Sequence, residues 1–76
     1  MSRQTRNDTI RTAAQECAEF NHGKPGAARM SNADVLHVRA ALKDEGETVT
    51  VLTSRDEAVM LDAYRAMMRQ IVRWSA

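Results

Sequence analysis

The 76-residue sequence contains one cysteine, one proline and three glycines, and its aromatic residues are Phe20, Tyr64 and Trp74. A lone cysteine, Cys17, cannot form an internal disulfide, which fits the reducing environment of the cytoplasm. No apolar run approaches the roughly 20 residues that a membrane span requires, and the start of the chain lacks the apolar core of a secretory signal. These absences predict a cytoplasmic protein without a membrane segment.

Patterns typical of catalysis and metal binding are also missing. His22 and His37 lie far from each other and from any zinc-ligand spacing, and the scattered glycines form no phosphate-binding loop. Cys17 falls on an apolar helical stripe, which favours a core thiol over a nucleophile. We therefore expect no enzyme activity, no metal ion and no cofactor.

The length and the polarity of the chain indicate its domain organisation. A chain of 76 residues forms one small domain, and such a domain is often marginally stable unless it is cross-linked or oligomeric. Residues 1–7 are polar and basic, so we expect a disordered tail there. Residues 8–76 are expected to form a single helical domain.

Apolar residues recur at helical spacing in three segments, which predicts helices over about 8–21, 32–45 and 55–74. Two glycines and a proline within residues 23–26 end the first helix. The buried stripe of that helix is expected to be Ile10, Ala13, Ala14, Cys17 and Phe20.

Capping patterns mark the starts of the other two helices. Ser31 and Asp34 have the spacing of a capping box for the second helix, and Ser54 and Glu57 have it for the third. Gly46 is placed to end the second helix. These local signals set the boundaries of the predicted helices.

The segment ETVTVLTS, residues 47–54, alternates threonine and valine and reads as extended backbone. The favoured interpretation is a linker that lays Val49, Val51 and Leu52 on the helices. The alternative is a strand that pairs with its copy across a dimer axis, which would satisfy its backbone groups. With the linker, the predicted fold class is all-α: a small three-helix domain with a disordered N-terminal tail and an extended segment before the long C-terminal helix.

Apolar side chains are unevenly distributed among the helices. Of 19 large apolar side chains (Ala, Cys and Met1 excluded), nine lie in the third helix. Eight of the nine, all but Val59, span an arc of roughly 160°, wider than the roughly 100° needed to pack on one neighbour. That helix also exceeds its neighbours in expected length, about 30 Å against about 21 Å. Either the two shorter helices cover the surplus by crossing it at different heights, or another chain covers it. The predicted protein-binding residues are Met60, Leu61, Tyr64, Met67, Met68, Ile71 and Trp74.

Arg65, Arg69 and Arg73 repeat every four residues on the polar face of the third helix, as a surface that follows phosphates would require. Asp62 shares that face, and residues 31–57 carry three cations and six anions, a net charge of −3 that disfavours a nucleic-acid surface. DNA binding through these arginines is kept as the alternative function.

The helix order and the stretch DEAVMLDAYRAMMRQIVRW resemble the QseM-type small antiactivator proteins of rhizobial integrative and conjugative elements, over roughly residues 8–74. No motif allows that family's binding residues to be transferred one by one. The resemblance implies a protein that binds transcriptional activators, among them a LuxR-type quorum-sensing regulator, and blocks their activation of transfer or excision genes.

Three functional hypotheses follow from the residues and the resemblance. In the first, the chain is an antiactivator that places the apolar face of its third helix in a groove of the regulator. In the second, it is a small DNA-binding regulator or excisionase-like protein. In the third, a homodimer covers its own surplus apolar face, so monomer and homodimer both remain open.

Overall fold

The computed structural model describes residues 2–75, with side chains as far as Trp74. The chain forms three helices, α1 (Arg3–Asn21), α2 (Asn32–Asp44) and α3 (Ser54–Ser75), and no strand occurs among the described residues. This confirms the predicted all-α, three-helix fold class. None of the helices in the described part of the chain is long and apolar enough to span a membrane.

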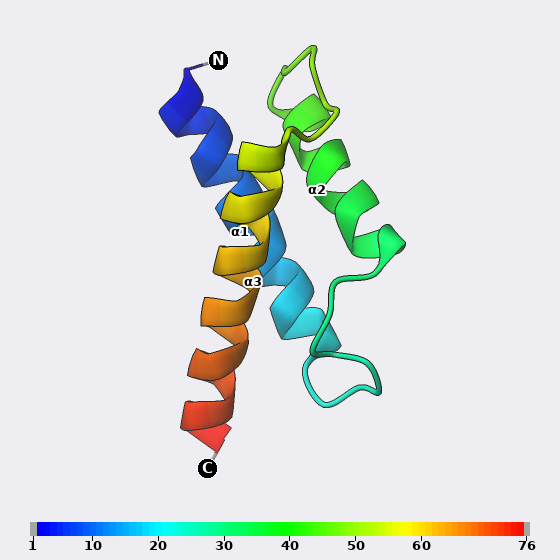
Figure 1. Cartoon of the computed structure of the whole chain (residues 1–76), viewed down its shortest axis with the longest axis vertical. Coiled ribbons are helices and arrows are strands. Elements are labelled where there is room, and N and C mark those ends of the chain that lie inside the picture. Colours follow the sequence, from blue (N-terminus) through cyan, green and yellow to red (C-terminus); the bar gives the residue numbers. More distant parts are fainter. Residues whose placement is uncertain (1, 76) are drawn as a thin grey trace.

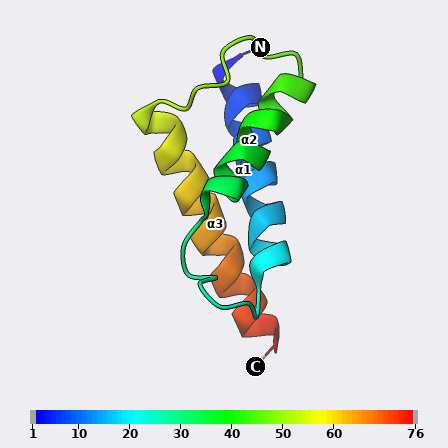
Figure 2. The ribbon, with the colours of Figure 1, turned by 90° about the vertical axis from the view of Figure 1, so that its right-hand side faces the viewer.

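Helix α1 is the element on which both other helices pack (Figures 1 and 2). It crosses α3 on one side and contacts α2 on the other, in a molecule that measures 40 × 21 × 21 Å. Among the described residues, no Cα atom of α2 lies within 8 Å of a Cα atom of α3. The close backbone contacts of both outer helices are therefore with α1.

Small side chains on α1 let the helices approach closely around a core of larger residues. The fully buried large side chains come from all three helices: Ile10, Val38, Leu42 and Tyr64. Four residues of the stripe predicted for α1 are buried, but its fifth, Phe20, is 71% exposed beyond the end of the core. The alanines and the cysteine that fill the rest of the α1 face are Ala13, Ala14, Cys17 and Ala18.

Helix α1 begins at Arg3, five residues before the predicted start. The Ser2 hydroxyl accepts a hydrogen bond from the Thr5 backbone N–H at 3.1 Å and so caps the helix. The predicted disordered tail is therefore wrong for residues 3–7, which form the first turns of α1, while Met1 lies outside the described residues.

The predicted capping box of α2 is confirmed. The Asp34 N–H donates to Ser31 Oγ at 3.2 Å, and the Ser31 N–H donates to Asp34 Oδ2 at 2.8 Å. At the start of α3 the same pattern lies one residue earlier than predicted. Thr53 and Asp56 exchange the two hydrogen bonds, at 3.0 and 3.1 Å, in place of Ser54 and Glu57.

Residues 47–53 form no strand with any described residue, as the linker interpretation predicted. The Arg6 guanidinium donates to the carbonyl oxygens of Val49 at 2.6 Å and Val51 at 3.3 Å, which fixes the course of this linker. Leu52 packs partly buried against the core, whereas the side chains of Val49 and Val51 are exposed. Strand pairing across a dimer axis stays a prediction.

Candidate protein-binding surface

The C-terminal part of α3 extends past the end of α1. Asn21, the last residue of α1, donates from Nδ2 to the Tyr64 hydroxyl at 3.3 Å, so α1 ends beside Tyr64. Residues 65–75 of α3 follow, and at a rise of about 1.5 Å per residue they add about 16 Å of helix. Figure 1 shows this end reaching beyond both α1 and the loop that follows it.

This extension carries a patch of apolar side chains. Trp74 is 69% exposed and Val72 is 54% exposed, and three further apolar residues beside them are half-buried. Methionine adapts its shape to a partner, and tryptophan is a frequent anchor of interfaces. We call this patch the α3-end surface, and its residues are Met67, Met68, Ile71, Val72 and Trp74.

The structure divides the seven residues predicted for protein binding. Met60 and Tyr64 are 3% and 1% exposed, because the face of α3 that carries them packs on α1, so they belong to the core. Leu61 is half-buried beside a groove between α2 and α3, away from the α3 end. The other four lie in the α3-end surface: Met67, Met68, Ile71 and Trp74. The prediction omitted Val72, although its place in the apolar arc of the helix was a signal for it.

A hydrogen-bonded network holds the base of the α3 end in place. The Tyr64 hydroxyl donates to the carbonyl oxygen of Ala27, in the loop between α1 and α2. Asn21 Nδ2 also donates to Asp34 Oδ2 at 2.9 Å, so α1, the loop, α2 and α3 meet at this point. These contacts hold Ala27 of the loop and Asp34 of α2 beside the base of the α3-end surface.

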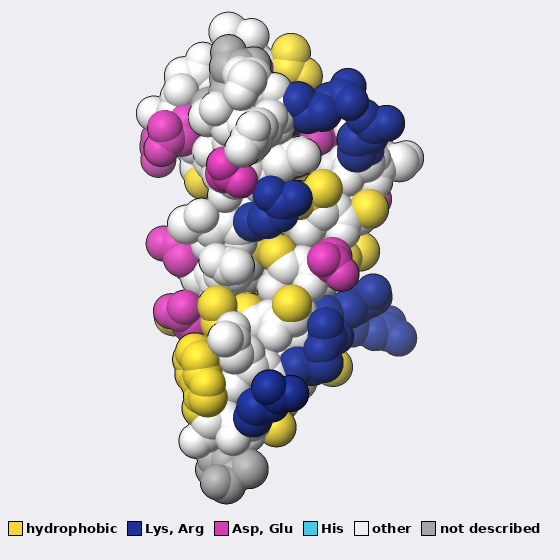
Figure 3. All heavy atoms as spheres, turned by 90° about the vertical axis from the view of Figure 1, so that its left-hand side faces the viewer, with side chains coloured by type: hydrophobic (Ala, Val, Ile, Leu, Met, Phe, Trp, Pro, Cys, Tyr) yellow, Lys and Arg dark blue, Asp and Glu magenta, His cyan; other side chains and the backbone are white. Residues whose placement is uncertain are grey.

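The arginines of the alternative hypothesis lie on the exposed side of the same helix. Arg65, Arg69 and Arg73 are all exposed, and none of them forms an ion pair with any residue that the structure describes. Figure 3 shows Lys and Arg side chains beside hydrophobic ones over the lower third of one face, with no acidic side chain visible among the described atoms there.

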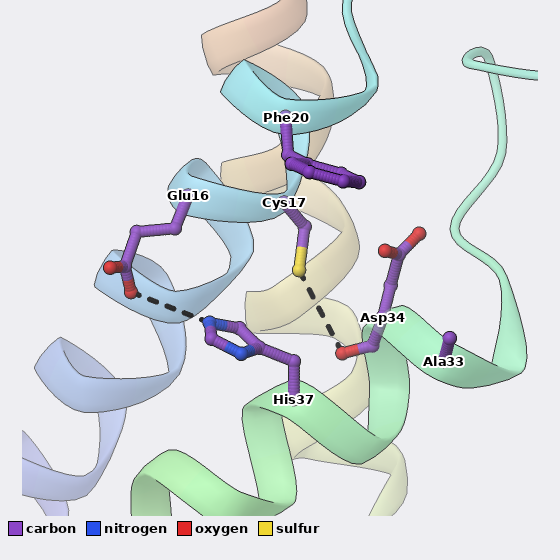
Figure 4. A pocket seen from close by; sticks show the side chains of 6 residues that line it. All are labelled: Glu16, Cys17, Phe20, Ala33, Asp34 and His37. Atoms are coloured by element: carbon purple, nitrogen blue, oxygen red, sulfur yellow. Dashed lines mark hydrogen bonds and ion pairs between the residues drawn. The ribbon is translucent and has the colours of Figure 1, made fainter. Parts of the chain in front are cut away.

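An apolar hollow between α1 and α2 contains the cysteine (Figure 4). The Cys17 thiol donates to the carbonyl oxygen of Asp34 at 3.8 Å, while His37 Nε2 lies 3.6 Å from Glu16 Oε1. Burial raises the pKa of the Cys17 thiol to about 11, and the nearby carboxylates of Asp34 and Glu16 act in the same direction. The side chains that a nucleophilic cysteine would need are close by, but the thiol is held in its protonated form.

The raised pKa leads to a prediction for thiol chemistry. At pH 8 the thiolate fraction of Cys17 is roughly two orders of magnitude below that of a free cysteine, so alkylation by iodoacetamide is expected to be at least about 100-fold slower in the folded protein than in urea. Mass spectrometry of timed samples measures both rates without interference, because Cys17 is the only cysteine. Rates within tenfold of each other would contradict the structural role assigned to this thiol.

Among residues 2–75, no three His, Cys, Asp or Glu side chains are grouped so that they could hold a metal ion. Comparison with known protein families, with curated proteins and with solved structures finds no match to this chain. The α3-end surface is therefore characterised by its geometry and chemistry alone.

Proposed function

We propose that the protein is a small antiactivator that binds a transcriptional activator through the α3-end surface. The observation that supports this proposal most directly is the exposure of Trp74 and Val72 on a helix end that extends past the end of α1. The sequence resemblance implies a LuxR-type activator as the partner. In this proposal the protein performs no chemistry and acts by occupying a surface that the activator needs.

The mode of binding follows from the shape of the helix end. An amphipathic helix that projects from a folded support can lie in an apolar groove of a larger protein, with anchors at helical spacing. Trp74 and Ile71 lie three residues apart, and Met67 lies one turn before Ile71, so the three side chains share one side of the helix. The support is already folded, so only the side chains of the surface need to be ordered on binding.

A reporter strain tests the proposal. The strain expresses a LuxR-type activator with a reporter gene under its promoter, and the wild-type protein is expected to lower reporter output. Val72→Glu with Trp74→Ala is expected to restore most of that output, because truncation of an interface anchor costs at least about 2 kcal/mol, roughly 30-fold in affinity. Normal reporter output in the presence of folded wild-type protein would refute the proposal for this class of activator.

A matched control variant tests whether inhibition requires the α3-end surface or only exposed apolar side chains in general. Leu36→Glu with Phe20→Ala makes the same kinds of change at two residues that are 59% and 71% exposed and lie outside the α3-end surface. This variant is expected to inhibit as strongly as the wild type.

The oligomeric state of the free protein is a separate test. Light scattering across concentration should give the mass of a monomer, and the fluorescence emission of Trp74 in the same samples should be red-shifted. A dimer with blue-shifted emission would mean that the protein covers its own surface.

DNA binding is the second candidate function, favoured by the three exposed and unpaired arginines Arg65, Arg69 and Arg73. It requires an affinity for duplex DNA that falls steeply as salt concentration rises, because each phosphate contact releases counterions. A titration at two salt concentrations therefore distinguishes it from antiactivation, in which the activator and not DNA is bound.

A further inference from the structure

A hollow lies on the side of the α3 end that faces the loop between α1 and α2. The hollow holds about 380 Å³ and is lined by Ala28, Tyr64, Arg65, Met68, Arg69 and Val72. Its apolar part comes from the alanine, the methionine, the valine and the tyrosine ring, while the two arginines supply its cationic part. Arg65 and Arg69 are one helical turn apart, so their guanidinium groups lie on the same side of α3.

The chain on either side of this hollow is basic, and the nearest acidic residue along α3 is Asp62, about one turn before Arg65. Residues 22–30 and 63–75 carry five cations and not one Asp or Glu. None of the five forms an ion pair with another described residue, although ion pairs occur elsewhere in the molecule. The cations are Lys24, Arg29, Arg65, Arg69 and Arg73.

We propose that the hollow receives an acidic amphipathic segment of the partner protein, with an apolar side chain against Met68 and Val72 and carboxylates paired with Arg65 and Arg69. This inference rests on the proposed function and adds the chemistry of the partner. A guanidinium binds a carboxylate through two parallel N–H···O hydrogen bonds, which fixes orientation as well as adding affinity.

Charge and shape favour this occupant over the alternatives. In a symmetric dimer the same patch faces itself, so two copies would bring the four guanidinium groups of Arg65 and Arg69 together, and no acidic side chain lines either hollow. A phosphate backbone or a lipid headgroup layer would pair with the arginines but would leave the concave apolar part of the hollow unfilled. A protein segment with apolar and acidic side chains at helical spacing fills both parts.

Two synthetic peptides of about 15 residues, long enough to populate a helix, test the inference. One peptide has leucines at helical spacing flanked by glutamates, and the other has glutamine in place of each glutamate. Fluorescence anisotropy of a dye attached to the end of each peptide reports binding. The wild-type protein is expected to bind the glutamate peptide at least about tenfold more tightly than the glutamine peptide, with a preference that shrinks as salt rises.

Variants that lack two positive charges test whether Arg65 and Arg69 cause the preference for the glutamate peptide. Arg65→Gln with Arg69→Gln is expected to reduce the preference to about twofold or less. Lys43→Gln with Arg55→Gln removes two exposed cations outside the hollow and should leave the preference unchanged.

Four outcomes would overturn the inference. The first two are equal binding of the two peptides and a preference for the glutamate peptide that survives Arg65→Gln with Arg69→Gln. The third is tighter binding of duplex DNA, or of vesicles that contain phosphatidylglycerol, than of the glutamate peptide. The fourth is that none of these probes binds. Failure of this kind leaves the antiactivator proposal standing if Val72→Glu with Trp74→Ala still abolishes inhibition in the reporter strain. Failure of the reporter assay itself would remove the proposed function.

Discussion

Arg6→Ala is expected to lower the free energy of unfolding by about 2–4 kcal/mol, because it removes the cationic partner of the buried Asp56 carboxylate and the donor to two linker carbonyl groups. Arg6 Nη2 and Nε donate to the two carboxylate oxygens of Asp56 at 2.9 and 3.3 Å, and Nη1 lies 3.5 Å from Glu47 Oε2. Asp56 is only 5% exposed. One guanidinium thus connects α1, the linker and the capping box of α3.

Thermal unfolding followed by circular dichroism measures this effect. For a domain of this size, about 1 kcal/mol corresponds to about 4–8 °C, so Tm should fall by about 8–32 °C. Arg6→Lys should recover only part of the loss, since an ammonium cannot reproduce the planar fork of donors. Arg11→Ala is the matched control. It breaks an exposed ion pair with Asp8 and is expected to cost less than about 1 kcal/mol.

The same contact makes stability depend on pH in a defined direction. The hydrogen bonds from Arg6 hold the pKa of the Asp56 carboxyl below its usual value, and hydrogen bonds from Thr53 add to this against the opposing effect of burial. A lowered pKa in the folded state means that the stabilisation is fully present above about pH 4 and is lost as pH falls through the folded-state pKa. The difference between wild type and Arg6→Ala should therefore narrow below about pH 4. A constant difference down to pH 2 would contradict the assigned ion pair.

Tyr64→Ala is expected to lower the free energy of unfolding by about 3–5 kcal/mol, because removal of a large buried ring leaves a cavity. Tyr64 is 1% exposed, and its hydroxyl donates to the Ala27 carbonyl oxygen and accepts from Asn21. Small domains lie near the lower end of the usual stability range, so this variant should be largely unfolded at 37 °C.

Urea unfolding of two further variants separates the contribution of the Tyr64 hydroxyl from that of its ring, and compares a buried with an exposed aromatic side chain. Tyr64→Phe keeps the ring and removes the hydroxyl, and it should cost about 1–2 kcal/mol through the unpaired carbonyl and amide groups. Trp74→Ala removes a larger aromatic side chain that is 69% exposed, and it should change stability by less than about 0.5 kcal/mol. If Trp74→Ala destabilised the fold as much as Tyr64→Ala, the distinction between the core and the α3-end surface would be wrong.

Local signals in the sequence predicted the helices well, and long-range contacts account for the differences. The capping box of α2 joins residues three apart and was predicted correctly. At α3 two overlapping patterns compete, Thr53 with Asp56 and Ser54 with Glu57. Asp56 is also the residue that Arg6 binds, 50 positions away in the chain. The contact between Arg6 and Asp56 also stabilises the first turns of α1, where the local composition indicated disorder.

The candidate surface was predicted only in part for a related reason. A helical periodicity identifies the apolar arc of α3, but it does not say how far along the helix a neighbour reaches. The buried position of Tyr64 depends on Asn21 and Ala27, which lie 43 and 37 residues away. The α3-end surface begins where these contacts stop, so its limit follows from the crossing of α1 and α3 and from the path of the loop.

The missing backbone contact between α2 and α3 has a consequence for native-state fluctuations. Because α2 has close backbone neighbours in α1 but none in α3, we expect α2 to detach as a unit while the α1–α3 pair stays assembled. Amide hydrogens of α2 should therefore exchange with solvent through a lower-energy opening than those of α1 and α3. In that transient state Val38 and Leu42 lose their cover, so the rate of opening also sets how often the interior becomes accessible to proteases.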